Sequence, residues 1–257
     1  MNNSISLQVR GSGLPLVLVH GFALDHRMWQ YQIDALSTHF RVIAVDVPGC
    51  GASPSQGARS VADLAKQLFV SIEPLLDNRA ATYIGLSMGG YIGWEMLSQF
   101  PHAFHAAVMC DTRASADLPT TAEGRRQMAR KVFEESTEAL LSPMIPRLLC
   151  DQTLASQPQV VQLMKEMMFT AAPQTIHDHQ IAMSERQDFQ DRLPNFHIPI
   201  LAICGEDDIL TPPKEMKRMA GLLPKGSFVE IEQAGHMAPL EQPLVVNQYI
   251  LNFLRAL

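Results

Sequence analysis

The sequence lacks long apolar runs, and even its most apolar stretches, such as residues 15–19, are far too short to span a bilayer. Its N-terminal segment has no basic region followed by an apolar stretch, so we expect no secretory signal and a cytoplasmic protein. Positive charge is scarce: the net charge is −6, which argues against a nucleic-acid partner. The 4 cysteines have no metal-ligand spacing, which predicts four reduced thiols in a cytoplasmic protein.

Short runs rich in Val, Ile and Leu recur along the 257 residues. Near-continuous apolar runs of this kind are typical of parallel strands that are covered on both faces. Helical patterns at residues 25–37 and 61–76 separate the early runs. This alternation predicts an α/β fold with a mostly parallel central sheet flanked by helices. The strand-like runs are residues 15–20, 41–46, 81–87, 105–111, 198–207 and 227–235.

The alternation stops after the fourth of these runs. The next 80 or so residues are helix-like, polar and rich in methionine, and they contain no strand-like run. We therefore predict a core made of residues 1–112 and 195–257, with a helical cap, residues 113–194, inserted between the two parts. Such a cap would lie over the carboxyl edge of the sheet, where open α/β sheets bind their ligands.

One serine lies between glycines where a strand-like run meets a helix-like run. Gly85-Leu86-Ser87-Met88-Gly89 matches the GxSxG pattern of a nucleophile turn. Side chains at the two glycine positions would collide with the neighbouring strand and helix. The serine hydroxyl would stand at the tip of the turn, near a helix N-terminus that favours developing negative charge. The purely structural alternative is a glycine-rich turn in which the serine caps the helix N-terminus.

A serine nucleophile needs a base and an orienting acid. His236 is the predicted base, because it follows the last strand-like run in a loop that can reach the serine. Asp208, just beyond the preceding strand-like run, is the predicted acid, and Asp207 and Glu206 are its immediate competitors. Asp111, at another strand end, is a further candidate. The order serine, acid, histidine suits an α/β-hydrolase arrangement.

Two backbone amides can hold the oxyanion, those of Phe22 and Met88. Met88 follows the nucleophile directly, and Phe22 follows the strand end at His20-Gly21. We expect His20 to fix this loop by hydrogen bonding and not to transfer protons. No set of histidines, cysteines and carboxylates converges by spacing, so we predict neither a metal nor an organic cofactor.

Five motifs in order resemble the α/β-hydrolase superfamily from about residue 14 to the C-terminus. They read HGF, DVPGCGAS (46–53), GLSMGG, GEDDILTP and GHMAPLEQP. The resemblance implies that Asp208, three residues after the motif glycine, is the catalytic acid. It also implies a cofactor-free hydrolase like the small cytoplasmic esterases and enol-lactonases that carry a helical cap.

The methionines of the insertion are candidates for the wall of the substrate pocket. Methionine is flexible and can line an adaptable apolar cavity, although core packing between helices is the favoured explanation for most methionines of the insertion. The predicted substrate contacts are Leu24, Trp29, Leu86, Met144 and Met168.

Arginines of the insertion offer a second kind of contact. Arg113, Arg125, Arg126 and Arg130 could bind a substrate carboxylate with two parallel donors, or they could simply form a solvated face.

The predicted activity is hydrolysis of a carboxylic ester of a small or medium acyl substrate through an acyl-enzyme intermediate. Enol-lactone hydrolysis, carbon–carbon bond hydrolysis and perhydrolysis use the same three groups and remain alternatives. A ligand receptor on a hydrolase scaffold is an alternative from another class. The expected partner is a small ester or lactone, and the sequence does not specify an oligomeric state.

Overall fold

A seven-stranded sheet forms the centre of the molecule, which is known from a computed structural model that describes residues 5–257. The strand order is β1-β3-β2-β4-β5-β6-β7, and every neighbouring pair is parallel except β1 with β3. The strands are β1 (Leu7–Arg10), β2 (Pro15–Val19), β3 (Arg41–Val45), β4 (Ala81–Leu86), β5 (Phe104–Cys110), β6 (Ile200–Gly205) and β7 (Gly226–Ile231).

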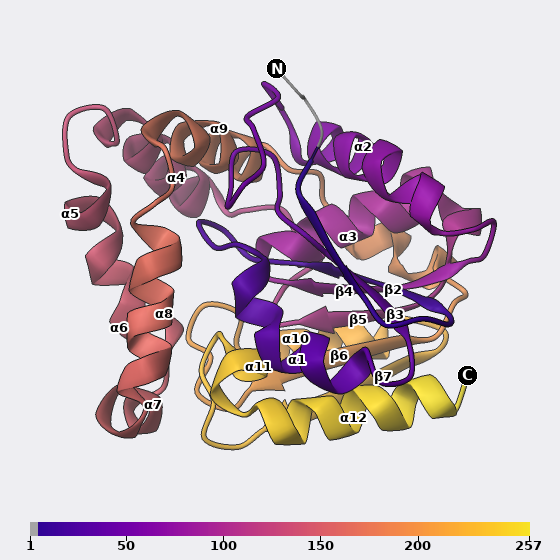
Figure 1. Cartoon of the computed structure of the whole chain (residues 1–257). Coiled ribbons are helices and arrows are strands. Elements are labelled where there is room, and N and C mark those ends of the chain that lie inside the picture. The colour runs from indigo at the N-terminus through magenta and orange to yellow at the C-terminus, as the bar shows by residue number, and fades with distance from the viewer. Residues whose placement is uncertain (1–4) are drawn as a thin grey trace.

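Helices flank this sheet, which confirms the predicted fold class (Figure 1). Pro74 ends α2 after Ile72, because a proline cannot donate the backbone hydrogen bond of a helix interior. Among residues 5–257, no helix combines the length and apolar character needed to cross a membrane. The helices of this part are η1 (His26–Trp29), α1 (Gln30–Leu36), α2 (Val61–Ile72), η2 (Glu73–Leu75), α3 (Met88–Gln99), η3 (Pro101–Ala103), α10 (Pro213–Gly221), α11 (Ala238–Glu241) and α12 (Pro243–Arg255).

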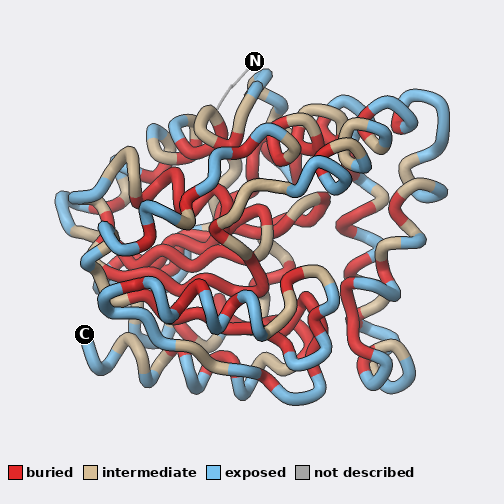
Figure 2. The backbone as a smooth tube through the Cα atoms, turned by 180° about the vertical axis from the view of Figure 1, so that it is seen from behind, coloured by how far each residue is buried: buried red, intermediate tan, exposed pale blue. Residues whose placement is uncertain are grey.

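The central strands are buried on both faces, as the buried centre of Figure 2 shows, whereas the edge strands β1 and β7 are partly exposed. Successive side chains of a strand point to opposite faces, so the central strands contribute to two hydrophobic clusters. In β2, Val17 and Val19 pack with α2, α3 and α10, whereas Leu16 and Leu18 pack with α1 and α12. This double coverage explains why the strands read as continuous apolar runs in the sequence.

The chain between β5 and β6 consists of helices joined by loops, and this described segment contains no strand. In Figure 1, α4 and α9 pack together at one end of the molecule, and α6 and α8 run down beside the sheet. The helices of this insertion are α4 (Pro119–Lys131), α5 (Thr137–Leu141), η4 (Ser142–Met144), α6 (Ile145–Leu148), α7 (Asp151–Ser156), α8 (Pro158–Met168), α9 (Pro173–Ser184) and η5 (Gln190–Asn195). That the segment 113–194 is a separate cap domain stays a prediction.

The turn after β3 holds the insertion against the core. Thr175 of α9 donates its hydroxyl to the Gly49 carbonyl at 3.1 Å, and the His179 ring contacts the Pro48 carbonyl at 3.0 Å. Gly49 has a φ of +86°, a backbone conformation that other residues rarely adopt. A Cβ atom there would also lie 2.4 Å from the Thr175 hydroxyl. The motif at residues 46–53 therefore joins the core to the insertion.

Candidate active site

Ser87 lies in a strained turn between β4 and α3. Its φ of 53° and ψ of −112° are rarely adopted by a residue with a side chain. The glycines make this turn possible: a Cβ on Gly89 would lie 2.2 Å from the Val19 carbonyl oxygen, and one on Gly85 would lie 2.5 Å from the Gly89 carbonyl oxygen. The predicted collision with neighbouring strand and helix is thus present, and the serine side chain stands clear of both elements.

A chain of hydrogen bonds joins the three predicted catalytic side chains. The His236 Nε2 atom lies 2.8 Å from the Ser87 Oγ atom, and the His236 Nδ1 atom lies 2.8 Å from Oδ2 of Asp208. Because a carboxylate accepts, Nδ1 carries the ring proton and Nε2 is left as the acceptor for the serine hydroxyl. The structure therefore brings together side chains from the ends of β4, β6 and β7 with the polarity that proton transfer from the serine requires.

Both oxygens of the Asp208 carboxylate accept hydrogen bonds. Oδ1 accepts the amides of Leu210 at 2.8 Å and Thr211 at 3.0 Å, and Oδ2 accepts the Thr211 hydroxyl as well as His236. Burial alone raises the pKa of this carboxyl, but the interactions with His236 and Thr211 outweigh burial and lower the pKa to about 2. Asp208 is thus an ionised acceptor at neutral pH.

The other acid candidates lie elsewhere. Glu206 and Asp207 are exposed, whereas Asp111 is fully buried and accepts the Gly205 amide at 2.8 Å. Burial and the nearby Asp208 charge raise the pKa of the Asp111 carboxyl well above its usual range. Of the four candidates, only Asp208 is hydrogen-bonded to His236 within residues 5–257.

The loop after β2 carries the first predicted oxyanion amide. Val47 donates its amide to Nε2 of His20 at 2.9 Å, so the ring proton lies on Nδ1, which contacts the Gly21 carbonyl at 2.8 Å. A Cβ on Gly21 would lie 2.9 Å from the Leu86 side chain, so glycine allows the loop to approach the serine turn. Neither Phe22 nor Met88 donates its amide to any acceptor in the described chain, which leaves both amides available for an oxyanion.

Glu241 anchors the loop that bears His236. Its Oε1 accepts the amides of Gly235 at 2.8 Å and Met237 at 3.2 Å, the two residues that flank the histidine. Its Oε2 accepts the Cys150 amide at 2.8 Å, at the start of α7 in the insertion. One buried carboxylate thus fixes the histidine loop and ties it to the insertion.

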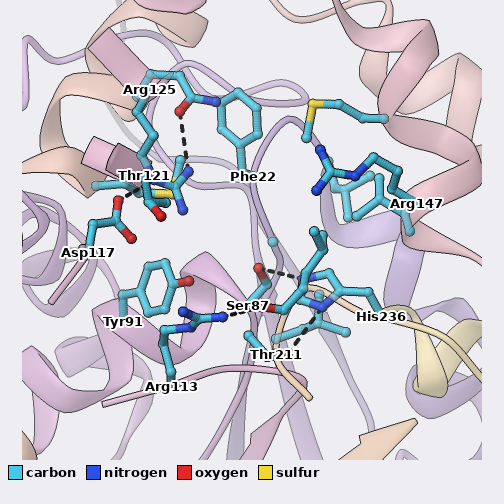
Figure 3. Close-up of a pocket in the computed structure, with 18 of the residues that line it drawn as sticks. Phe22, Ser87, Tyr91, Arg113, Asp117, Thr121, Arg125, Arg147, Thr211 and His236 are labelled. Atoms are coloured by element: carbon cyan, nitrogen blue, oxygen red, sulfur yellow. Dashed lines mark hydrogen bonds and ion pairs between the residues drawn. The ribbon is translucent and has the colours of Figure 1, made fainter. Parts of the chain in front are cut away.

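A pocket of about 490 Å³ opens in front of Ser87 and His236 (Figure 3). Of the predicted substrate contacts, Leu24, Leu86 and Met144 line it. Trp29 and Met168 are fully buried in the hydrophobic core and lie outside the pocket wall, so direct contact with a substrate is not expected of them.

The four arginines considered from the sequence separate into two pairs. Arg113 and Arg125 line the pocket. Arg126 and Arg130 both pair with Glu123 on the surface of α4, at 3.0 Å and 2.9 Å, and form the solvated face that was the alternative interpretation.

Sequence reasoning missed several residues of the site, among them Thr211, Tyr91 and Arg147. Thr211 orients Asp208, and its position three residues after the aspartate is a recognisable signal for a local hydroxyl–carboxylate bond. Tyr91 lines the pocket four residues after Ser87, on the same face of α3. Arg147 also lines the pocket, but nothing in its sequence context distinguishes it from other surface arginines.

Among residues 5–257, two groups of side chains have the spacing of metal ligands. In the group of Asp25, His26 and Asp46, the carboxylates already accept hydrogen bonds from Arg27 and His26. The other group consists of Asp111, Asp208 and the buried Cys204, and here Asp208 is engaged by His236. Existing protein contacts account for these clusters, so neither supports a metal site.

Comparisons with known proteins identify the family. A family model described as the alpha/beta hydrolase fold matches residues 15–243, so the chain belongs to this family, as its motifs predict. The chain is similar to a pimeloyl-[acyl-carrier protein] methyl ester esterase of Vibrio vulnificus, with 26% identity over 98% of this chain and 99% of the relative.

Solved structures agree with this assignment. A thermophilic esterase from Thermogutta terrifontis, solved with malate bound, is 36% identical, with a TM-score of 0.95 over 98% of this chain and 93% of that one. An enol-lactonase from Burkholderia xenovorans is 23% identical, with a TM-score of 0.88 over 98% and 96% of the two chains, and this likeness concerns the fold alone.

Proposed function

We propose that the protein is a serine hydrolase that cleaves carboxylic esters of small or medium acyl groups, with Ser87, His236 and Asp208 as its catalytic residues. The class, an ester-cleaving hydrolase, follows from the family match and from the esterases among the relatives. The observation that carries the residue roles is the hydrogen-bond chain from Asp208 through His236 to Ser87, which opens on a pocket.

In the proposed mechanism, Ser87 Oγ attacks the ester carbonyl while its proton passes to His236 Nε2. The amides of Phe22 and Met88 hold the oxyanion of the tetrahedral intermediate, and each such donor supplies on the order of 3 kcal/mol of transition-state stabilisation. His236 then protonates the leaving alcohol, and an acyl-enzyme remains. Water, deprotonated by the same imidazole, attacks the acyl group and releases the acid and the serine. Asp208 holds the ring and stabilises the imidazolium throughout.

Two observations support a small acid as the acyl part of the substrate. The malate in the Thermogutta terrifontis structure is a small dicarboxylate, and the pocket of this chain is small and has arginines in its wall. The cytoplasmic location expected from the sequence stays a prediction.

A panel of p-nitrophenyl esters of increasing acyl length tests the activity directly. We expect rapid turnover by the parent protein, and a loss of at least about 10⁴-fold in kcat for both Ser87→Ala and His236→Ala, with unchanged folding by circular dichroism. Activity above about one hundredth of the parent in His236→Ala would remove the histidine from the role of base. The enzymatic alternatives predict other outcomes: an enol-lactone or a diketone would be cleaved faster than a simple ester, or hydrogen peroxide would replace water as the nucleophile that attacks the acyl-enzyme. Tight binding without turnover would indicate a receptor.

A further inference from the structure

The charged residues of the pocket oppose the charge of the whole protein. The chain carries a net charge of −6, yet the charged side chains that line the pocket are three arginines and one aspartate. Clefts lined by one sign of charge concentrate ligands of the other sign. The pocket therefore favours an anionic ligand, and the partners of each arginine decide which of them is free to bind it.

Arg125 is already neutralised. Its Nε atom pairs at 2.6 Å with the buried Asp117, and its Nη1 atom donates to the Gln180 side chain at 3.2 Å. Asp117 also pairs with the buried Arg186 at 2.7 Å. Because breaking a buried ion pair leaves an uncompensated charge, this group belongs to the framework of the pocket wall.

Arg113 is also engaged. One of its Nη atoms donates to the Leu210 carbonyl, in the loop that follows Asp208, and lies 3.8 Å from a Glu215 carboxylate oxygen. Its guanidinium therefore supports the loop that carries the proposed catalytic acid. A ligand that bound the Arg113 guanidinium would have to compete with Leu210 and Glu215.

Arg147 differs from the other two pocket arginines because its guanidinium has no protein partner in the described chain. Within residues 5–257 it donates to no acceptor and pairs with no carboxylate. Figure 3 shows its guanidinium directed toward the cavity from the side opposite Arg125 and Asp117, with Ser87 and His236 below. A free guanidinium presents a planar fork that fits one carboxylate through two parallel hydrogen bonds.

The wall near Arg147 is apolar. Met144 and Leu148, one turn or less from Arg147, line the pocket together with Leu24, Leu86 and Met237. These side chains belong to or pack against one hydrophobic cluster. A short hydrocarbon chain can lie on such a surface while its two ends meet polar groups, the serine at one end and the guanidinium at the other.

We propose that the pocket takes monoesters of dicarboxylic acids, and that Arg147 receives the free carboxylate of the acyl part while Ser87 attacks the ester. This rests on the proposed function, whose substrate class it narrows. A phosphate dianion is less well suited, because it would call for a second unpaired cation and the other two pocket arginines are engaged.

The test compares esters that differ only in charge. Monomethyl succinate, glutarate, adipate and pimelate are compared with methyl esters in which the distal carboxylate is replaced by a primary amide, and methanol release gives kcat/KM. For the best chain length we expect the parent to prefer the carboxylate ester by about tenfold, as for a charge-assisted bidentate contact. In Arg147→Gln that ratio should fall to about one, and Arg147→Lys should keep part of it because the charge remains without the fork.

Arg126→Gln is the matched control, because it removes the same charge from a surface arginine that pairs with Glu123 outside the pocket. The carboxylate-to-amide ratio of this variant should equal that of the parent. Hydrolysis of p-nitrophenyl acetate is measured in parallel. If the acetate is cleaved but the parent shows no preference for the carboxylate, or Arg147→Gln retains that preference, this inference is overturned and the proposed function stands. If the parent cleaves neither the acetate nor any methyl ester, the proposed function and this inference both fall.

Discussion

The core and the insertion hold their charged groups in different ways. In the core, the carboxylates around the site accept backbone amides: Asp208 takes two and Glu241 takes three. In the insertion, the carboxylate that lines the pocket, Asp117, pairs instead with the side chains of Arg125 and Arg186. Backbone contacts fix a carboxylate relative to the chain, so the core sets the geometry of the reaction. Side-chain pairs can be exchanged by substitution without moving the backbone, so the insertion is suited to select the substrate.

The largest effect that this comparison predicts is on the acid. Asp208→Asn should lower kcat about 10³- to 10⁴-fold, because an amide in this position favours the wrong imidazole tautomer. Steady-state hydrolysis of a p-nitrophenyl ester measures the loss, and thermal unfolding controls for stability. A loss below tenfold would show that another carboxyl, with Asp111 as the first candidate, performs this role.

A change at the junction of the two regions should affect stability and turnover together. In Glu241→Gln, an NH₂ group replaces one of the oxygens that accept the three amides, so buried donors are left unsatisfied. We expect a loss of about 2–3 kcal/mol in the free energy of unfolding, and a fall in kcat of about tenfold, because the flanking residues position His236.

Urea unfolding and p-nitrophenyl acetate turnover give these two quantities for Glu241→Gln. Glu232→Gln, at an exposed glutamate of the same loop, is the matched control and should change neither. Full stability in Glu241→Gln would mean that this carboxylate does not anchor the histidine loop.

Selection by the insertion should produce a smaller effect that depends on the substrate. Met144→Ala removes a partly buried side chain from the pocket wall. We expect kcat/KM for p-nitrophenyl hexanoate to fall about fivefold, since roughly 1 kcal/mol of apolar contact is lost, whereas the acetate should be turned over within a factor of two. An equal loss on both esters would place Met144 among the residues that maintain the catalytic geometry, contrary to the division between the two regions.

The smallest effect on activity is expected at Asp111. Its folded pKa is raised above the unfolded value of 3.8, so folding binds a proton, and stability falls as pH rises from that value toward the folded pKa. Asp111→Asn has no such proton to bind. Asparagine also tolerates the φ of 44° at this position.

The stability of Asp111→Asn relative to the parent should therefore increase between pH 5 and pH 7.5, with turnover within threefold of the parent. Unfolding midpoints in urea at the two pH values measure this difference. A constant or shrinking difference would contradict a raised pKa of this carboxyl in the folded protein.

The parts that could be predicted from the sequence are those fixed by local backbone requirements. The Ser87 turn needs glycine where a Cβ would meet the Val19 carbonyl, and buried parallel strands need continuous apolar runs. Those needs leave recognisable patterns. The order of the proposed catalytic residues could be read in the same way, because each follows a strand end.

The pocket wall could not be read in this way, because contacts between distant helices decide it. Trp29 lies near the site in the sequence and Met168 lies in the predicted cap. Both side chains are nevertheless buried in the hydrophobic core. Arg147 has an ordinary local sequence, and only the packing of α6 beside the core brings it to the pocket. Charge pairing likewise depends on tertiary contacts, as the different partners of Arg125 and Arg126 show.

Labelling with diethyl p-nitrophenyl phosphate, followed by peptide mass spectrometry, tests the central claim most directly, because this reagent phosphorylates a serine whose proton is taken by a neighbouring base. The account predicts one diethylphosphoryl group per chain, on the peptide that contains Ser87, in step with the loss of esterase activity. Complete inactivation with Ser87 unmodified, or a label on another residue, would contradict it.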